Sequence, residues 1–449
     1  MAKIKLLAHN QDVAGVLLHR TINPMLSIEK NHSDEFEVTI NQNVNWTDYE
    51  YLKQFDIITG HREFASYETH QAFFDFCDKH QIVNVLDIDD YLGLHMNHPL
   101  FSLVKSNSLD KKGYEMISKC DGITTTTDYF RNILLQHNKT ICALENGIDP
   151  EISSQFKFRR KESDRLRLSL VLGSSHLEDM KMFTDCGQIL SNSDSTLLDK
   201  ISISLNGYDL RGSTNNITIN PDLLKEMADR NLNIAELFKQ FNRVGGAIDK
   251  ISCLPPDLKL KYADRFTSTE QKPIQPHESV WFQYEKIITD NYKLIKDPDY
   301  LTHLQRYVNE PYENENTQVY RRYFTKNINS YATHYDNTDV SIVLLKNDSE
   351  FNRCKSALKI CEAQAKHCAL IVSSHPIYNL YLRHGVNSLI AQDNRDYIKL
   401  IKRYANNPNM VIDHQNQLRE DVKDVFDLTK ITEKRVAFYK ELLHKKGRI

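Results

Sequence analysis

The chain has 449 residues, too many for one hydrophobic core, so its length predicts two or three domains. Its content of 40% hydrophobic and 26% charged residues is typical of a soluble globular protein. The net charge is −3, from 57 basic and 60 acidic residues, which excludes an overall basic bias of the kind that favours nucleic acid.

The sequence also limits where the protein is expected to work. No apolar run is long enough to cross a bilayer, and no charged and then apolar leader opens the chain, so we expect a cytoplasmic protein. Eight cysteines are scattered through apolar segments and are expected to be reduced and buried. Cys354, Cys361 and Cys368 are spaced by seven, but no Cys-x-x-Cys pair or nearby His-x₃-His accompanies them, so no metal is expected there.

The first 160 residues alternate short apolar runs with helical segments, which predicts a Rossmann-like domain. Gly15 follows the first of these strands, in a loop that leads into a helix. A glycine is useful where backbone must come close to a ligand, although it also fits an ordinary turn. The predicted strands cover residues 4–8, 56–59, 83–90, 120–127 and 140–144, and the predicted helices cover residues 67–79 and 129–136 with Thr127 or Asp128 as N-cap.

Carboxylates end the strand at 83–90. Asp87, Asp89 and Asp90 can orient the hydroxyl groups of a substrate, or they can cap the next helix. His95 and His98 follow in a loop beside a proline. Both histidines are candidates for contacting a phosphate or an acceptor, and the competing interpretation is that they are merely exposed.

A basic linker, 157–165, leads to a strong buried strand at 166–173. Ser174, Ser175, His176 and Asp179 follow it. The two serines can donate to phosphate oxygens beside the free N–H groups of a helix N-terminus. In the competing interpretation, Ser175 caps that helix and Asp179 complements its dipole. Both interpretations can hold at once.

The chain then departs from the strand and helix repeat. After a strand at 200–205, residues 211–309 contain helical patterns joined by connections with prolines, which we interpret as an inserted, mostly helical subdomain. Its predicted helices cover 223–241, 280–295 and 300–307. Further on, residues 397–404 and 433–443 are predicted to be amphipathic helices.

The most informative stretch is 339–393, which predicts a strand at 340–345, a helix, and a strand at 369–373. The helical pattern has an apolar face and, on another side, the charged residues Lys355, Lys359, Glu362 and Lys366. A lysine can meet a phosphate as a point charge, and a carboxylate can accept both hydroxyls of a ribose. The competing interpretation is a solvated face stabilised by salt bridges. The apolar face is formed by Cys354, Leu358, Cys361 and Ala365.

Several motifs of this stretch resemble the nucleotide-sugar half of family 4-like glycosyltransferases of the GT-B fold. The resemblance rests on the run at 339–345, then on Phe351-Asn352, Lys355-Ser356, Lys359, Glu362-Ala363 and His384-Gly385-Val386-Asn387. Earlier in the chain, Glu145-Asn146-Gly147-Ile148-Asp149 resembles the passage between the two domains of such enzymes, although Asn-Gly is also a common tight turn.

The resemblance implies an α/β fold of two Rossmann-like domains that face a cleft. The expected domains are 1–160 for the acceptor, 161–430 for the nucleotide sugar with the insertion at about 211–309, and a helix at 431–449 that returns to the first domain. The residues implied in donor binding are Glu362 on the ribose, with Ser174, Ser175, His176, Asp179, Ser356 and Gly15. The residues implied in catalysis are Lys355, Lys359, His98 and Asp89. Many members carry a glutamate where this chain has Cys354, and a subgroup with the Lys-Ser…Lys…Glu form lacks it too.

The expected activity is transfer of a hexosyl or pentosyl group from a nucleoside diphosphate sugar to an acceptor hydroxyl. The resemblance implies retention of anomeric configuration, no metal and no cofactor besides the nucleotide sugar as co-substrate. The acceptor stays open among a glycan, a lipid-linked sugar, a protein and a modified DNA base.

Three alternatives remain at this stage. A nucleotide-sugar epimerase can share the double fold and the donor site. A binding scaffold without catalysis is also compatible with Cys354. Asp87-Ile88-Asp89 resembles the metal-binding Asp-x-Asp of GT-A glycosyltransferases, but the nucleotide pattern lies far along the chain in the other half.

Overall fold

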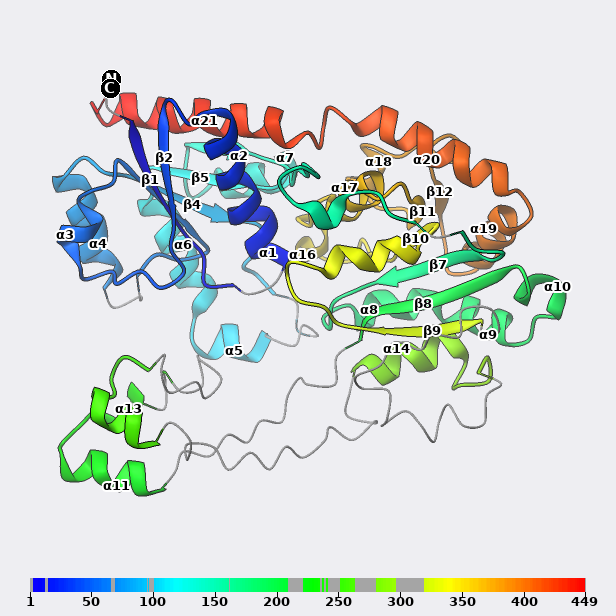
Figure 1. Cartoon of the computed structure of the whole chain (residues 1–449), viewed down its shortest axis with the longest axis horizontal. Helices are drawn as coiled ribbons and strands as arrows, with labels where there is room; N and C mark the ends of the chain where they lie inside the picture. The colour runs from blue at the N-terminus through cyan, green and yellow to red at the C-terminus, as the bar shows by residue number, and fades with distance from the viewer. Residues whose placement is uncertain are drawn as a thin grey trace. The chain divides into compact units, whose positions relative to one another are not determined.

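The structure is a computed structural model of the whole chain (Figure 1). It describes residues 3–12, 15–65, 69–94, 96, 101–160, 162–208, 221–234, 236–237, 240, 251–262, 280–295 and 319–448. Two six-stranded parallel sheets dominate it, as predicted for a doubled Rossmann-like architecture.

The N-terminal sheet has the strand order β2-β1-β3-β4-β5-β6, with every neighbouring pair parallel. Its strands β3, β4 and β5 are buried along their whole length because helices cover both faces of the sheet. The alternation of polar and apolar residues in β2 hid that strand from the sequence analysis. The strands are β1 (Ile4–His9), β2 (Phe36–Ile40), β3 (Ile57–His61), β4 (Val83–Ile88), β5 (Gly122–Thr125) and β6 (Ile141–Ala143).

The C-terminal sheet has the order β12-β11-β10-β7-β8-β9 and is also parallel throughout. Because β7 and β10 are parallel neighbours, the loops that follow them lie side by side at the carboxyl ends of the strands, which we call the carboxyl edge of the sheet. The short β12 and the edge strand β9, which is rich in arginine and tyrosine, were not predicted. The strands are β7 (Leu166–Val171), β8 (Ile201–Tyr208), β9 (Tyr320–Phe324), β10 (Val340–Val343), β11 (Ala369–Ser373) and β12 (Leu389–Ala391).

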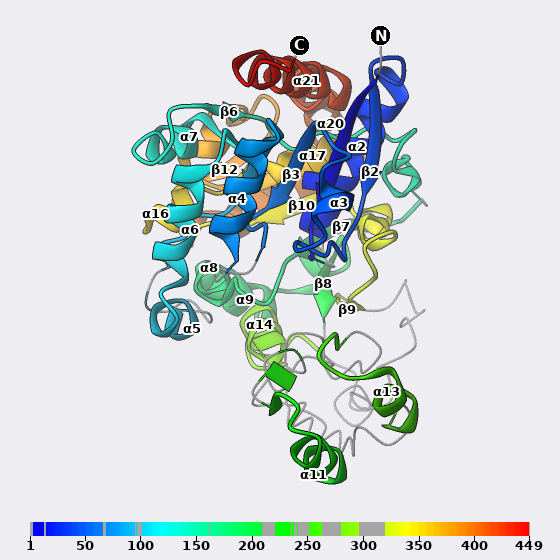
Figure 2. The ribbon, with the colours of Figure 1, turned by 90° about the vertical axis from the view of Figure 1, so that its left-hand side faces the viewer.

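Helices pack on both faces of the N-terminal sheet, and Figure 2 shows α4 and α6 beside its strands. Thr127 is the N-cap of α7, as predicted, and its hydroxyl accepts from the Phe130 N–H at 3.2 Å. The helical segments of the first domain are α1 (Gly15–Leu17), the π-helical turn η1 (Leu18–Ile22), α2 (Asn23–Asn31), α3 (Tyr49–Leu52), α4 (His70–Lys79), α5 (Phe101–Ser106), α6 (Leu109–Lys119), α7 (Asp128–Leu134) and η2 (Ser154–Phe156).

The helical segments around the second sheet are shorter on average. They are α8 (Leu177–Met180), η3 (Lys181–Phe183), α9 (Thr184–Ser191), α10 (Ser195–Leu198), α14 (Val280–Thr289), η7 (Tyr331–Asn337), α16 (Glu350–Arg353), α17 (Leu358–Ala365), α18 (Pro376–Asn379), α19 (Asp396–Ala405) and α20 (Pro408–Val422).

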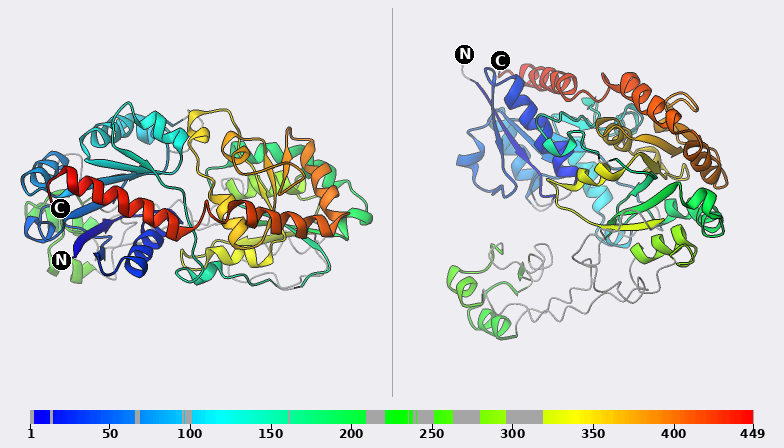
Figure 3. Two further views of the ribbon diagram at one scale, coloured as in Figure 1. Left: turned by 90° about the horizontal axis from the view of Figure 1, so that it is seen from above. Right: turned by 45° about the vertical axis from the view of Figure 1, so that its right-hand side comes forward.

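The last helix, α21 (Leu428–Lys445), packs on the first domain and not on the sheet that precedes it in the chain. Figure 3 shows it running along the N-terminal elements, whereas α20 lies with the C-terminal sheet. Tyr439 and Leu442 join the core formed by β1 and α2, and Thr432 donates to the Ser27 hydroxyl at 2.8 Å. Gly147 permits the close approach at the start of this helix, because a Cβ there would lie 2.8 Å from the Cα of Leu428.

Residues Asp209–Phe282 form a separate compact unit, of which two helices are α11 (Pro221–Asp229) and α13 (Pro256–Tyr262). Leu223, Met227 and Leu258 belong to its own hydrophobic core. The predicted helix 223–241 is shorter in the structure because the chain turns at Asn231, whose φ is +52°. The predicted helix 280–295 ends at Thr289 because the three residues after it have positive φ. The predicted helix 300–307 lies outside the described residues.

All eight cysteines are free thiols, and six of them are buried. Within the described part of the chain, no helix combines the length and the apolar character needed to span a membrane.

We expect the core beneath α21 to contribute much of the stability of the first domain. Leu442→Ala should lower the free energy of unfolding by about 3 kcal/mol, because it removes buried methyl groups and leaves a cavity. Ile412→Ala on α20 is the matched control, since Ile412 is 54% exposed and its loss should cost less than about 0.5 kcal/mol. Urea unfolding measures both variants, and equal losses would contradict the packing described for α21.

Candidate functional site

Two loops at the carboxyl edge of the C-terminal sheet are joined by Asp179. Its Oδ2 lies 2.8 Å from Nδ1 of His176, and its Oδ1 accepts from the backbone N–H of Lys346 at 2.8 Å. His176 follows β7 and Lys346 follows β10, so this carboxylate ties the two loops together. The His176 and Asp179 predicted for donor binding therefore form one hydrogen-bonded unit.

Ser174 and Ser175 lie in the exposed turn before α8. The N-cap of this four-residue helix is His176, and no side chain caps it, so the predicted capping role of Ser175 is wrong. The backbone N–H of His176 donates instead to the Tyr284 hydroxyl at 2.9 Å. Among the described residues, no hydrogen bond engages either serine hydroxyl, which leaves both able to donate to a ligand.

The predicted single helix after β10 is two helices in the structure. α16 ends at Arg353, and α17 begins at Leu358. Lys355 and Ser356 therefore lie in the turn before α17 and not on one helical face with Lys359. Cys354 is wholly buried in the hydrophobic cluster of the N-terminal sheet, so the thiol at the position of the family glutamate has no access to a ligand.

Glu362 is the centre of a polar cluster at the start of α17, and its side chain is 1% exposed. Its Oε2 accepts from Nζ of Lys359 at 2.8 Å and from the Tyr335 hydroxyl at 2.7 Å. Its Oε1 accepts from the Tyr331 hydroxyl at 2.8 Å. The interpretation of this face as solvated is wrong, because Lys366 is also buried and donates to the backbone oxygen of Gln155 at 2.7 Å.

The first domain reaches Glu362 through His19, whose Nε2 lies 3.8 Å from Oε1. Burial lowers the pKa of His19 to about 4, so its ring is neutral at pH 7. The Tyr331 hydroxyl bonds both groups, and because it gives its one hydrogen to Glu362 it accepts from Nε2 of His19. Gly15 lies beside this contact, since a Cβ there would be 3.9 Å from Cζ of Tyr331.

Burial raises the pKa of Glu362, but the positive charge of Lys359 and the hydrogen bonds from Lys359 and Tyr335 outweigh that effect and lower it below the ordinary value. Glu362 is therefore ionised at neutral pH. A buried, ionised carboxylate beside a lysine is a group prepared for hydroxyl donors, and a ribose offers two of them.

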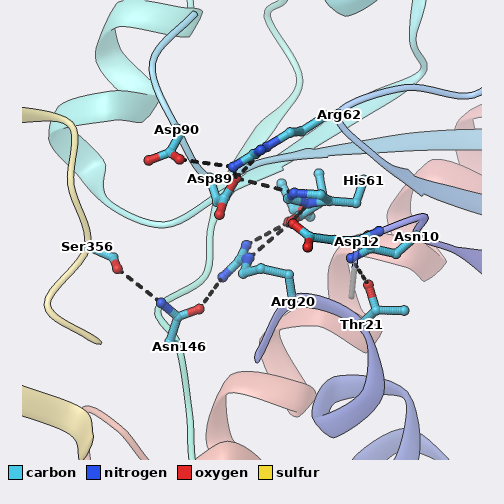
Figure 4. A network of polar contacts seen from close by, with 12 residues as sticks. Asn10, Asp12, Arg20, Thr21, His61, Arg62, Asp89, Asp90, Asn146 and Ser356 are labelled. Atoms are coloured by element: carbon cyan, nitrogen blue, oxygen red, sulfur yellow. Dashed lines mark hydrogen bonds and ion pairs between the residues drawn. The ribbon is translucent and has the colours of Figure 1, made fainter. Parts of the chain in front are cut away.

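A second polar network lies in the first domain (Figure 4). Asp87 at the end of β4 is buried, and Arg20 holds both of its oxygens, with Nε at 3.0 Å and Nη2 at 2.6 Å. Thr124 donates to the same carboxylate at 2.6 Å, and Nδ1 of His61 lies 3.0 Å from it. Burial raises the pKa of Asp87, but the charge of Arg20 and the hydrogen bond from His61 hold it well below its usual range.

His61 stands between two carboxylates, with Nε2 at 3.3 Å from Asp89. Burial lowers the pKa of His61, but the charge of Asp89 and the hydrogen bond to Asp87 raise it to about 9. Arg62 also holds Asp89, with Nε at 3.0 Å and Nη2 at 2.9 Å from Oδ1. Asp87 and Asp89 are thus paired with protein cations, which contradicts the Asp-x-Asp metal interpretation.

Two contacts join this network to the turn before α17. Nζ of Lys355 donates to Oδ1 of Asp90 at 2.6 Å, and Nδ2 of Asn146 donates to the Ser356 hydroxyl at 3.1 Å. Asn146 in turn accepts from Arg20 at 3.2 Å, so it has an interdomain role beyond that of a turn residue (Figure 4). The structure therefore brings Lys355, Ser356, Lys359 and Glu362 of the second domain against Gly15 and the strand ends of the first.

Other predicted residues are placed differently. His95 and His98 lie outside the described residues. His375 at the end of β11 was not predicted to have a role, and burial lowers its pKa to about 4. Its Nδ1 accepts from the Ile377 N–H at 3.3 Å, so the hydrogen of the neutral ring is on Nε2, which has no partner among the described residues.

The sequence analysis also missed Arg20, His61, Arg62, Tyr331 and Tyr335. They come from three separate segments, and none was part of the spaced motif on which the donor prediction rested. The sequence held one indication of the cations Arg20, His61 and Arg62: two carboxylates end a buried strand, and two buried acids require nearby cations.

Solved structures with the same arrangement of sheets are glycosyltransferases. HepE of Anabaena in complex with UDP and glucose matches with a TM-score of 0.53 and 10% identity, over 98% of this chain and 100% of that one. The sucrose-phosphate synthase of Thermosynechococcus elongatus matches with a TM-score of 0.53 and 10% identity, over 99% and 100%. The fold is GT-B.

An alpha-glucosyltransferase (AGT) in complex with UDP shares this GT-B fold, with a TM-score of 0.52 and 10% identity over 98% of this chain and 100% of that one. No protein-family model and no curated protein matches the chain by sequence. No group of three or more His, Cys, Asp or Glu side chains that could hold a metal occurs in the described part of this GT-B chain.

The raised pKa of His61 gives a stability that depends on pH. The protonated ring stabilises the fold fully below its unfolded pKa of 6.5, and this contribution is lost as the pH rises through about 9. The difference in free energy of unfolding between wild type and His61→Gln should therefore shrink by about 3 kcal/mol across that window. Urea titrations of both proteins at several pH values measure it, and a constant difference would contradict the assigned charge.

Proposed function

We propose that the protein is a glycosyltransferase that moves a sugar from a nucleoside diphosphate sugar to an acceptor hydroxyl. One observation carries the proposal: Glu362, buried, ionised and paired with Lys359, lies at the carboxyl edge of the C-terminal sheet, with Oε1 3.8 Å from Nε2 of His19 in the other domain. The GT-B fold supports it, since HepE and AGT of the same fold have been solved with UDP.

The donor would lie across the two loops of the C-terminal sheet and the start of α17. Glu362 would accept the ribose hydroxyls, and Lys355 and Lys359 would meet the diphosphate. The free hydroxyls of Ser174 and Ser175 would donate to phosphate oxygens, with Ser356 and the backbone at Gly15 nearby. Because Glu362 is almost inaccessible, the Tyr331 hydroxyl must move aside before a ribose reaches Oε1.

The proposed reaction needs little covalent catalysis from the protein. Negative charge grows on the leaving diphosphate, and the ammonium groups of Lys355 and Lys359 would stabilise it. We propose that transfer proceeds with retention and without a metal, as in the enzymes that the Lys-Ser…Lys…Glu motif resembles. The first domain would hold the acceptor beside Asp89 and Asp90, with His98 as a further candidate. The acceptor class stays open among glycans, lipid-linked sugars, proteins and modified DNA bases.

The donor site predicts stabilisation by nucleotide. UDP, GDP, ADP or dTDP bound only to the native state at 100 times its dissociation constant should raise the free energy of unfolding by about 2.7 kcal/mol, seen as a higher melting temperature. Glu362→Ala should abolish the shift. Glu362→Gln serves if the alanine variant does not fold, and it should weaken binding at least about tenfold.

Glu441→Ala is the matched control, because Glu441 is an exposed glutamate on α21 that pairs only with Lys445 among the described residues. Its shift should equal that of the wild type. An unchanged shift in both Glu362 variants would reject the ribose role of Glu362, whereas no shift with any nucleotide in the wild type would reject the donor site.

The activity itself is tested by incubation with nucleotide sugars. We expect release of the nucleoside diphosphate, faster when a suitable acceptor hydroxyl is present, unchanged by EDTA, and with the anomeric configuration of the donor kept in the product. Chromatography and NMR of the products measure this. An epimerised nucleotide sugar formed without acceptor would identify an epimerase instead, and binding without turnover would identify a scaffold.

A further inference from the structure

Asp90 differs from the two other acids at the end of β4. Arg20, His61 and Thr124 surround Asp87, and His61 with Arg62 surrounds Asp89, so the side chains of these two acids are 4% and 12% exposed. The Asp90 side chain is 31% exposed. Of the three, Asp90 alone is both accessible and bonded across the domain boundary.

Its two oxygens have partners from different domains. Oδ2 accepts from Nη2 of Arg62 at 2.9 Å within the first domain (Figure 4). Oδ1 accepts from Nζ of Lys355, in the second domain, at 2.6 Å. Lys355 is the group to which we assign the donor diphosphate. That ammonium is therefore paired with a carboxylate of the first domain.

We propose that Asp90 is a positioning residue that takes the place of the donor diphosphate on Lys355 and is released when the donor binds. This inference rests on the proposed function and adds a competition to it. A carboxylate carries one negative charge, whereas a diphosphate carries at least two and offers more acceptor oxygens. The donor diphosphate therefore binds Lys355 more strongly than Asp90 does, and its binding breaks the Lys355–Asp90 ion pair.

The surroundings keep Lys355 in reach of both partners. Its ammonium lies 4.1 Å from the centre of the Phe351 ring, a contact that holds the charge at this place whichever anion it meets. The neighbouring Ser356 is fixed to Asn146 independently of Asp90. The Lys355 ammonium therefore only has to move from Asp90 to a phosphate, and the turn does not have to rearrange.

Release has a consequence for the acceptor. Arg62 continues to hold Oδ2 of Asp90, so the carboxylate stays in place while Oδ1 becomes free to accept a hydroxyl. An acceptor hydroxyl that needs this oxygen finds it only after the donor is bound. Asp90 thereby couples the two substrates, with the donor entering first.

A double-mutant cycle on nucleotide binding tests the competition. Dissociation constants for UDP, GDP, ADP and dTDP are measured by calorimetry for wild type, Asp90→Asn, Lys355→Met and the double variant. Asp90→Asn should bind the preferred nucleotide about five times more tightly than wild type, because a partly exposed ion pair no longer has to be broken. In the Lys355→Met background the same change should have no effect.

A further variant acts as the control. Asp110→Asn removes an aspartate of the same domain that pairs with Lys105, and it should leave the affinity unchanged.

The outcomes separate the inference from the proposed function. Nucleotide binding by the wild type with equal or weaker binding by Asp90→Asn overturns the competition while the donor site stands. Tighter binding that persists in the Lys355→Met background also overturns it, because the effect then does not pass through Lys355. Absence of binding to the wild type overturns the proposed function and the inference with it.

Discussion

The structure around the site depends on one buried negative charge, that of Glu362. An ionised carboxylate removed from water is costly unless protein groups replace the lost hydration. Here Lys359, Tyr335 and Tyr331 replace it, and each fixes a different part of the molecule. Lys359 lies in the first turn of α17, and both tyrosines belong to η7. Tyr331 also bonds His19 of the other domain. The ribose role proposed for Glu362 therefore requires the Tyr331 hydroxyl to leave Oε1 first.

The first domain contributes a series of charged side chains of alternating sign. From Arg20 through Asp87, His61, Asp89, Arg62 and Asp90, each group neutralises the next, and the series ends on Lys355 of the second domain. At the buried end of this series, Asp87 is fixed in place because its two oxygens are bonded to Arg20, Thr124 and His61. The accessible end is where exchange with a ligand is possible, and it coincides with the turn before α17.

Much of the fold could be predicted from the sequence, because strands buried on both faces are mostly apolar runs that can be recognised without knowing their partners. β4, β7, β10 and β11 belong to this group. The strands that were not predicted, β2, β9 and β12, are all edge strands; β2 and β9 carry polar side chains, and β12 has only three residues. The break between α16 and α17 also escaped, since helical periodicity continues across Cys354 although that thiol packs against the other domain.

The site was predictable only where residue types follow one another at fixed spacing, as Lys355, Lys359 and Glu362 do. Their partners, Tyr331, His19 and Asp90, come from distant segments and become visible only when the chain is folded. Burial was the property that spacing could not reveal. It excluded the competing interpretation of Glu362 as part of a solvated face, and it distinguished Asp90 from Asp87 and Asp89.

A crystal structure of the protein with UDP tests the central claim most directly. The account predicts the ribose hydroxyls on the carboxylate of Glu362, the diphosphate on the ammonium groups of Lys355 and Lys359, and the Tyr331 hydroxyl displaced from Oε1. Nucleotide bound elsewhere, with Glu362 still enclosed by Lys359 and the two tyrosines, would contradict it.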